Sequence, residues 1–157
     1  MSRQLPKFDM LSANYPDAPA ETVKRQIGGH VNADWITNTC AIRLSRALNY
    51  AGVLIPSHFP RLHVVSGYDH RWYAYRMQEL KRWVEHTFGH PNIVEKGGGT
   101  TSRSALAGHQ GIIAFDIHFS DASGHIDLWD GNDFYESIYA TSDYFARATK
   151  IFLWEAP

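Results

Sequence analysis

The residue with the clearest chemical potential is Cys40, the only cysteine in the chain. It stands near the start of residues 38–49, where apolar side chains recur at helical spacing, so the pattern predicts an amphipathic helix beginning at about Cys40. A thiol attacks carbonyl groups as the thiolate, and the positive end of a helix lowers the pKa of a thiol placed there. The position leaves two roles open, a nucleophile and a small buried apolar side chain.

A second chemical signal is the strand-like run of residues 124–131, which His125 opens. A rigid strand can aim an imidazole, and this one could hold a thiolate as an ion pair and then protonate a leaving amine. The chain has nine histidines, and we rank His125 above the others because it heads an apolar strand. A cysteine at a helix start followed by a histidine on a later strand is the layout of a papain-like thiol hydrolase.

An acid that orients the imidazole is expected close to His125. Strand alternation places Asp127 on the same face as His125, which makes it one candidate. Asp133 is another, although a turn-forming role suits it better, and Asp130 is expected to form a turn on the opposite face. These residues alone leave the choice open.

The elements that must position these groups follow an α+β order, because helices come first and strands gather later. Asn38 or Thr39 is expected to cap the cysteine helix, and residues 111–119 are expected to form a central strand. Residues 97–102 are expected to form a flexible loop, residues 121–124 and 130–133 to form turns, and residues 135–146 carry no clear pattern. Helices are expected at residues 7–13, 17–27, 40–51 and 78–88, and strands at residues 62–65, 71–77, 111–119, 125–129 and 149–154.

Size and charge limit what the chain can be. It has 157 residues, 44% hydrophobic and 13% aromatic, so residues 1–157 are expected to form one domain with a substantial core. The net charge of −1 gives no general attraction to nucleic acid or to anionic membranes. No apolar run approaches membrane-spanning length and the N-terminus lacks a secretory signal, so the chain is expected to be made in the cytoplasm.

Residues 38–45 and 124–131 together resemble the fourth family of amidase effectors of the bacterial type VI secretion system. Residues 27–31, before the cysteine helix, and residues 111–115, before the histidine, are further matches. The likeness covers most of the chain from about Glu21 onward.

The resemblance implies a papain-like, NlpC-type α+β fold in which the nucleophile helix packs on an antiparallel sheet. It implies hydrolysis, without a cofactor, of the amide between D-glutamate and meso-diaminopimelate in the peptide stems of peptidoglycan. By position, it makes Cys40 the nucleophile and His125 the base. The family's third residue is an aspartate eleven positions after that histidine, where this chain has Glu136, and the cysteine pair that often flanks this acid is absent here.

The resemblance also implies a partner and a destination. A small immunity protein is expected to block the site in the producing cell. Type VI secretion is expected to deliver the chain to the periplasm of a target cell, where peptidoglycan lies.

Two other functional classes stay open. A metal-dependent hydrolase could use His118 and His125, but no metal is expected, because the spacing of the available ligands matches no metalloprotease motif. A wall- or glycan-binding module without catalysis could use the abundant Trp and Tyr side chains. The ligands considered for a metal are Asp116, His118, Asp121, His125 and Asp127.

Two further motifs carry weaker signals. Residues 96–101 are rich in glycine but lack the Gly-Lys-Ser/Thr end of a phosphate-binding loop. Residues 71–76 mix arginines with aromatic side chains, as a nucleic-acid-binding face would. The nearly neutral chain favours a half-buried strand whose arginines reach out to solvent.

Overall fold

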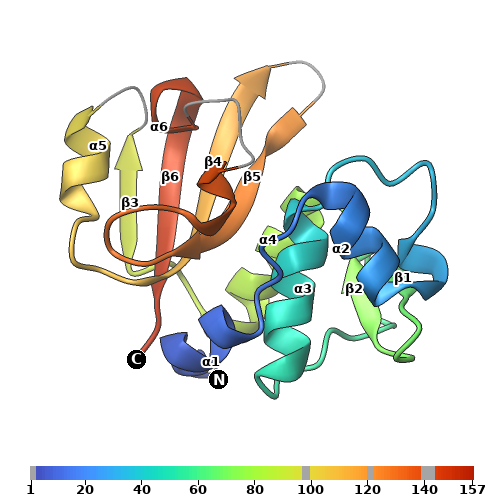
Figure 1. Ribbon diagram of the computed structural model, residues 1–157. Helices are drawn as coiled ribbons and strands as arrows, with labels where there is room; N and C mark the ends of the chain where they lie inside the picture. The colour runs from blue at the N-terminus through green and yellow to red at the C-terminus, as the bar shows by residue number, and fades with distance from the viewer. Residues whose placement is uncertain (1–2, 97–99, 120–121, 139–143) are drawn as a thin grey trace.

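The molecule has two lobes, which meet where helix α3 (Cys40–Tyr50) packs against strand β5 (Ala122–Trp129) (Figure 1). The computed structural model describes residues 3–96, 100–119, 122–138 and 144–157. The helical lobe comes from the first half of the chain and includes a two-stranded sheet, whereas the sheet lobe holds a four-stranded sheet and shorter helices. The α+β class expected from the sequence is confirmed.

The central element of the helical lobe is α3. Its residues Leu44, Ala47 and Leu48 are fully buried, and the helix also packs against α1 and β2. The predicted helices and strands of this lobe are all present within a few residues of their expected bounds. The lobe comprises α1 (Phe8–Ala13), α2 (Ala20–Ile27), the 3-10 helix η1 (Gly29–Val31), α3, β1 (Val64–Ser66), β2 (Trp72–Ala74) and α4 (Met77–Phe88).

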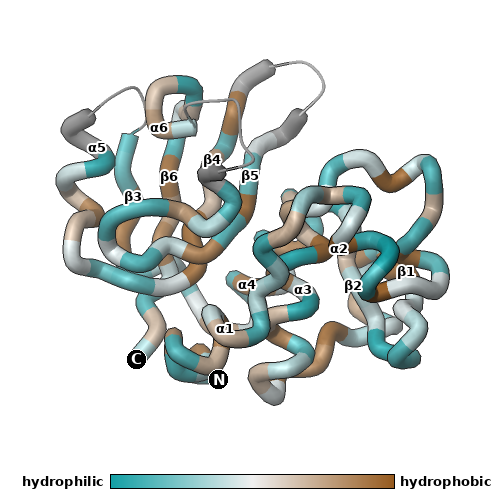
Figure 2. Tube along the Cα trace, viewed as in Figure 1, coloured by the Kyte–Doolittle hydropathy of each residue, from teal (hydrophilic) through white to brown (hydrophobic). Residues whose placement is uncertain are grey.

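The four-stranded sheet has the order β3-β6-β4-β5, and every neighbouring pair is antiparallel. Strand β4 lies between β6 and β5, which confirms that residues 111–119 form a central strand. Figure 2 shows long hydrophobic stretches along β4 and β6, as expected of strands covered on both faces. The strands are β3 (Ile93–Lys96), β4 (Gly111–Phe119), β5 and β6 (Ala148–Glu155).

Two hydrophobic clusters cover opposite faces of this sheet. One face packs toward the helical lobe through Ile112, Ala114, Ile126 and Leu128. The other face packs through Ile113, Phe115, Trp129, Ile151 and Leu153 against Leu106 and Phe145. Because His125 is paired with Phe115 across β4 and β5, its side chain lies on this second face, at the edge strand beside α3.

Three features of the sheet lobe differ from the sequence predictions. Residues 100–102, predicted as loop, lie in α5 (Thr100–Ala105), because the run of glycines ends before Thr100 and no Gly or Pro follows within the helix. Ala122–Gly124, predicted as turn, belong to β5, where pairing with β4 outweighs local turn composition. Strand β3 was not predicted. Residues 97–99 and 121 lie outside the described part of the chain.

The segment without a clear pattern contains two short helices. These are η2 (Tyr135–Ile138) and α6 (Tyr144–Arg147), and residues 139–143 between them lie outside the described part of the chain. The predicted turn at residues 130–133 is present, because the Asp133 carbonyl accepts a hydrogen bond from the Asp130 amide at 3.1 Å. The turn thus brings η2 back beside β5.

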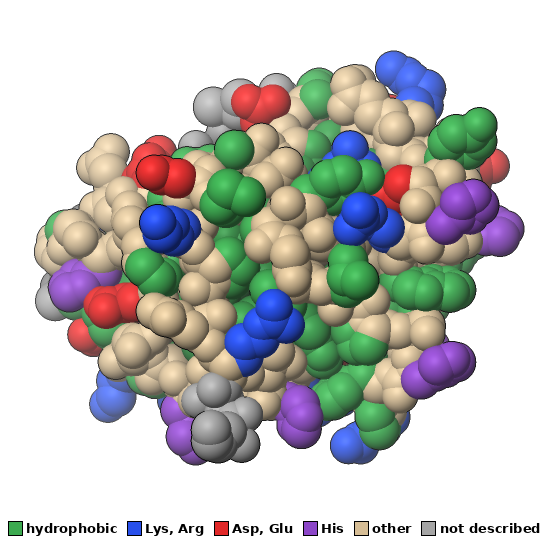
Figure 3. Space-filling view, turned by 90° about the horizontal axis from the view of Figure 1, so that it is seen from below, with side chains coloured by type: hydrophobic (Ala, Val, Ile, Leu, Met, Phe, Trp, Pro, Cys, Tyr) green, Lys and Arg blue, Asp and Glu red, His purple; other side chains and the backbone are tan. Residues whose placement is uncertain are grey.

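The surface agrees with the weak net charge. On the face shown in Figure 3, Lys and Arg side chains are spread among apolar and polar ones rather than gathered into one patch. Among the described residues, no helix is both long and apolar enough to cross a bilayer.

Gly124 sets the backbone just before His125, and we expect Gly124→Ala to destabilise the protein by more than about 1 kcal/mol. Its φ is 146°, and a Cβ there would overlap the Phe115 carbonyl oxygen across the sheet. Gly52→Ala is the control, because Gly52 also has a positive φ, 95°, but open space around it. Urea unfolding measures both variants, and a loss at Gly124 no greater than at Gly52 would contradict this account.

Candidate active site

Cys40 is the first residue of α3 and is almost completely buried. Of the two predicted caps, Thr39 is the N-cap residue but makes no capping hydrogen bond with its side chain. The backbone N–H of Cys40 donates to Oδ1 of Asn38 at 3.0 Å. The Thr39 hydroxyl instead accepts from Nε of Arg43 at 3.0 Å. The thiol therefore lies at the N-terminal, positive end of the helix.

His125 projects from β5 and joins the thiol to a carboxylate. Its Nε2 lies 2.8 Å from Oδ2 of Asp127, and Cys40 is also among its hydrogen-bond partners. Burial on its own lowers the pKa of this imidazole, but the hydrogen bonds and charges of Asp127 and Cys40 outweigh burial and raise the pKa from 6.5 to about 10. The site thus favours the imidazolium.

Asp127 is fully buried and held on several sides. In addition to His125, its carboxylate accepts hydrogen bonds from the backbone N–H groups of Leu128 at 2.7 Å, Tyr135 at 3.2 Å and Glu136 at 3.0 Å. The last two come from η2, so the turn after β5 completes the surroundings of the carboxylate. This network fixes the orientation of the acid that faces the imidazole.

Glu136 is the second carboxylate of the site. Its Oε2 lies 3.6 Å from Nε2 of His125, and its Oε1 lies 3.6 Å from Nε of Arg43. Oε2 is buried and has no hydrogen-bond partner among the described residues. The pKa of Glu136 lies above its ordinary value, mainly because the side chain is buried. The positive charges of His125 and Arg43 act against this rise, and the negative charge of Asp127 adds to it.

The other acids considered from the sequence lie elsewhere. Asp133 forms an ion pair with Arg103 at 3.1 Å. Asp130 accepts the backbone N–H groups of Asn132 and Asp133 within its turn, as expected of a turn-forming residue. Among these candidates, Asp127 and Glu136 are thus the two that the fold brings to His125.

Two neighbours of the site were missed in the sequence. Tyr144 stacks on the His125 ring, with centroids 4.2 Å apart and planes 7° apart. Arg43 is buried, and its Nη1 donates to the Pro16 carbonyl at 2.9 Å. Arg43 stands three residues after Cys40 on a buried helix. A cation on the buried face of a helix needs an anion nearby, so the sequence could have indicated an acidic partner close to Cys40. Tyr144 lies in the segment that showed no pattern.

Three of these residues could also hold a metal ion. His125, Asp127 and Glu136 each place one ligand atom within 4.8 Å of the others. The Arg43 guanidinium faces Glu136, and Asp127 already accepts three backbone N–H groups. The guanidinium and the N–H groups balance the negative charge of the carboxylates without a metal ion.

Of the larger metal set considered from the sequence, the side chains that the structure describes come together only at His125 and Asp127. Asp116 forms an ion pair with Lys81 at 3.1 Å, and its pairing with Gly124 puts it out of phase with His125 and Asp127 on the sheet. The side chain of His118 and the whole of Asp121 lie outside the described part of the structure.

Solved structures with the same shape include bacterial effectors. The chain matches a chain of the Tae4/Tai4 effector–immunity system from Salmonella typhimurium with a TM-score of 0.89 and 27% identity, over 98% of this chain and 100% of that chain. It matches Tae4 from Enterobacter cloacae with a TM-score of 0.86 and 28% identity over all of both chains. No curated protein sequence matches at a significant level.

The family is decided by the sequence itself. Residues 36–154 match the model of the type VI secretion system (T6SS) amidase effector protein 4 family, Tae4. The chain belongs to this family. The segment that matches the Tae4 family contains all the site residues described above, from Cys40 on α3 to Glu136 on η2.

The raised pKa of His125 makes stability depend on pH. The folded protein keeps a proton that the unfolded chain releases above pH 6.5, so this contribution is complete below pH 6.5 and is lost as pH rises toward about 10. We expect the free energy of unfolding to fall over this range by a larger amount in the wild type than in His125→Gln. Urea unfolding at pH 6 and pH 10 measures both, and equal falls would contradict the shift.

Proposed function

We propose that this chain is a cysteine amidase that hydrolyses the amide between D-glutamate and meso-diaminopimelate in peptidoglycan stems. The observation that carries the proposal is the placement of His125 between a thiol at a helix start and a buried carboxylate. Membership of an amidase effector family supports the reaction class. Cys40 is the nucleophile and His125 the base, with no cofactor.

The reaction proceeds in two balanced steps. The Cys40 thiol gives its proton to His125, and the thiolate attacks the amide carbonyl carbon. When the C–N bond breaks, the imidazolium gives that proton to the leaving amine, and a thioester remains. Water then attacks the thioester while His125 takes its proton, and the acid product leaves as His125 returns the proton to sulfur.

The protein assists both steps by fixed charges. The backbone N–H groups that follow Cys40 in the first turn of α3 are the expected donors to an oxyanion at the sulfur-bound carbon, where each such donor typically contributes about 3 kcal/mol. Asp127 orients the imidazole through its hydrogen bond, and Glu136 adds a second negative charge at 3.6 Å. The arrangement of α3 against a sheet that carries His125 supports a papain-like, NlpC-type fold.

Its partner and its destination follow from the same proposal. The similar solved structures include Tae4–Tai4 effector–immunity pairs from Salmonella typhimurium and Enterobacter cloacae, and we extend this pairing to a cognate immunity protein for this chain. The chain is then delivered by type VI secretion to the periplasm of a target cell.

Cys40→Ala is the decisive variant. We expect it to lower cleavage of purified peptidoglycan at least a thousandfold, because removing a nucleophile leaves little catalysis, while the melting temperature stays near the wild-type value. Mass spectrometry of the released muropeptides reports both activity and the bond that is cut. Activity close to wild type would end the proposal.

Asp127→Asn and Glu136→Gln separate the two carboxylates. We expect Asp127→Asn to lower kcat on the order of a thousandfold, because the acid that hydrogen-bonds the imidazole is lost. Glu136→Gln is expected to lower kcat about tenfold, since only the charge at 3.6 Å is removed. A greater loss in Glu136→Gln would assign the orienting role to Glu136.

A metal-dependent hydrolase is the second candidate, because three ligand atoms converge at His125, Asp127 and Glu136. The two classes respond oppositely to reagents. Iodoacetamide inactivates a cysteine amidase and EDTA does not, whereas sensitivity to EDTA with resistance to iodoacetamide would favour the metal.

A further inference from the structure

A pocket of about 240 Å³ is lined in part by the segment that leads into the nucleophile helix. One of its walls is Asn38, whose side chain also accepts a hydrogen bond from the backbone N–H of Cys40 at 3.0 Å. Asn38 therefore connects the pocket to the backbone of Cys40. The lining consists of Trp35, Ile36, Thr37, Asn38, Tyr75 and Arg76.

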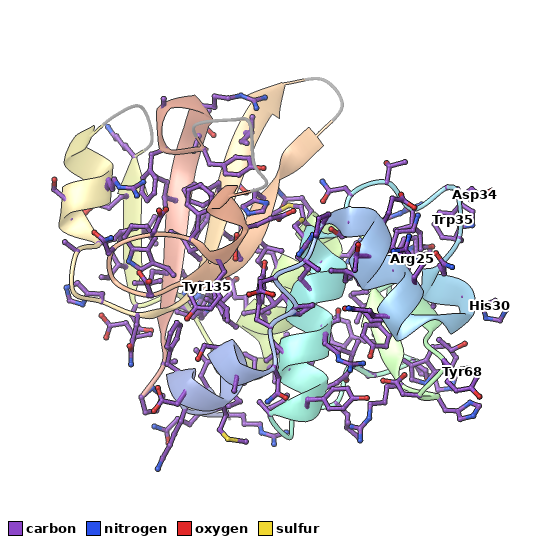
Figure 4. The ribbon with its side chains drawn as sticks, viewed as in Figure 1. Arg25, His30, Asp34, Trp35, Tyr68 and Tyr135 are labelled. Carbon is purple, nitrogen blue, oxygen red and sulfur yellow. The ribbon has the colours of Figure 1, made fainter. Side chains whose placement is uncertain are left out.

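One side of the pocket is aromatic. Trp35 lies on the segment that leads from η1 to α3, at the outer side of the helical lobe (Figure 4). Its ring meets Tyr75 edge to face at 4.9 Å, although 60% of Trp35 is exposed. Trp and Tyr provide large, rigid contact surfaces, and here the exposed Trp35 is supported by the partly buried Tyr75, which favours a role of Trp35 in binding.

Among the described residues that line the pocket, Arg76 is the only charged one. Its guanidinium lies 5.7 Å from the Tyr75 ring centroid and 3.5 Å from Glu79, and its side chain is largely exposed. Glu79 also accepts the backbone N–H of His63 at 2.9 Å and contacts its imidazole at 3.0 Å, so it has partners without Arg76. Because exposed ion pairs contribute little, a ligand carboxylate can replace Glu79 on Arg76.

The backbone around the pocket carries partial positive charge, which is the same sign as that of Arg76. Arg76 directly precedes the first residue of α4, and Asn38 lies two residues before the first residue of α3. The positive ends of both helices thus border the pocket. An aromatic side, a guanidinium and two helix starts suit a ligand with a short aliphatic part and a carboxylate.

We propose that this pocket binds a carboxylate of the peptide stem that flanks the scissile amide. The proposal rests on the proposed function. A glutamyl residue uses one carboxyl group to form the amide, and its other carboxyl group stays free. Diaminopimelate also carries carboxyl groups. Arg76 binds the carboxylate, while Trp35 and Tyr75 pack on the aliphatic carbons. Residues 71–76, which include β2, thereby contribute to substrate selection through Tyr75 and Arg76.

The test compares Arg76→Gln with the wild type on three stem peptides. One has all carboxylates free, one carries an amide at the D-glutamyl carboxylate, and one carries amides at the diaminopimelate carboxylates. We expect the wild type to lose about tenfold or more in kcat/KM, through KM, on one of the amidated peptides, which identifies the bound carboxylate. Arg76→Gln is expected to cleave that peptide and the free-acid peptide equally slowly.

Arg82→Gln is the matched control. Arg82 lies on α4, the helix that Arg76 precedes, and carries the same charge, but its guanidinium donates to the Pro60 carbonyl at 2.6 Å and it does not line this pocket. We expect it to discriminate between the peptides as the wild type does. If Arg76→Gln keeps the wild-type discrimination, or if the wild type shows none, the pocket does not bind a carboxylate.

Failure of the proposed function gives a different result. If the wild type cleaves none of the peptides, the proposed reaction is wrong, whatever the pocket binds. Calorimetric titration of the free-acid peptide into Cys40→Ala and into Cys40→Ala with Arg76→Gln then decides on the pocket alone. Binding that weakens at least tenfold in the double variant supports it, and equal or absent binding overturns it.

Discussion

The hydrogen bond between His125 and Asp127 is the interaction on which the site depends. A buried imidazolium is costly unless an anion faces it, and a buried carboxylate is costly unless donors surround it. Here the Asp127 carboxylate stabilises the imidazolium, and the imidazolium donates to the carboxylate. The backbone N–H groups of Leu128, Tyr135 and Glu136 satisfy the remaining acceptor positions of Asp127. The turn at residues 130–133 thus matters because it returns η2 to within reach of that carboxylate.

The second requirement is that the two lobes keep a fixed relation, because the thiol and the imidazole come from different lobes. The packing of both α3 and α4 against β5 holds the lobes in this relation. Arg43 adds a polar tie from α3, since it contacts the Pro16 carbonyl and lies 3.6 Å from Glu136 on η2. A buried cation of this kind is weak evidence for stability, but it fixes which groups can meet across the junction.

The sequence was informative where local pattern decides structure. The helical spacing after Cys40 and the alternation through His125 and Asp127 predicted the elements and the face that these residues share. Long-range packing decided the rest. Ala122–Gly124 has the composition of a turn, yet β4 recruits it into β5. Tyr144 contacts His125 only because α6 folds back over the sheet. The spacing of apolar residues in the sequence does not predict such a long-range contact.

Spacing from a family motif and geometry also answer different questions. The spacing assigned the third role to Glu136, and the structure places Glu136 beside His125 at 3.6 Å, with Asp127 closer at 2.8 Å. Two acids therefore converge on one imidazole, which a search for a single third residue does not anticipate.

The parallel stack of Tyr144 on His125 limits the order of events in the proposed reaction. Because Tyr144 covers one flat side of the imidazole and Nε2 is hydrogen-bonded to Asp127, proton exchange takes place at the ring edge that carries the remaining nitrogen. The departing amine and the incoming water would have to use that edge in turn. Deacylation would then wait for the first product to diffuse away, and the thioester would stay shielded from solvent until it does.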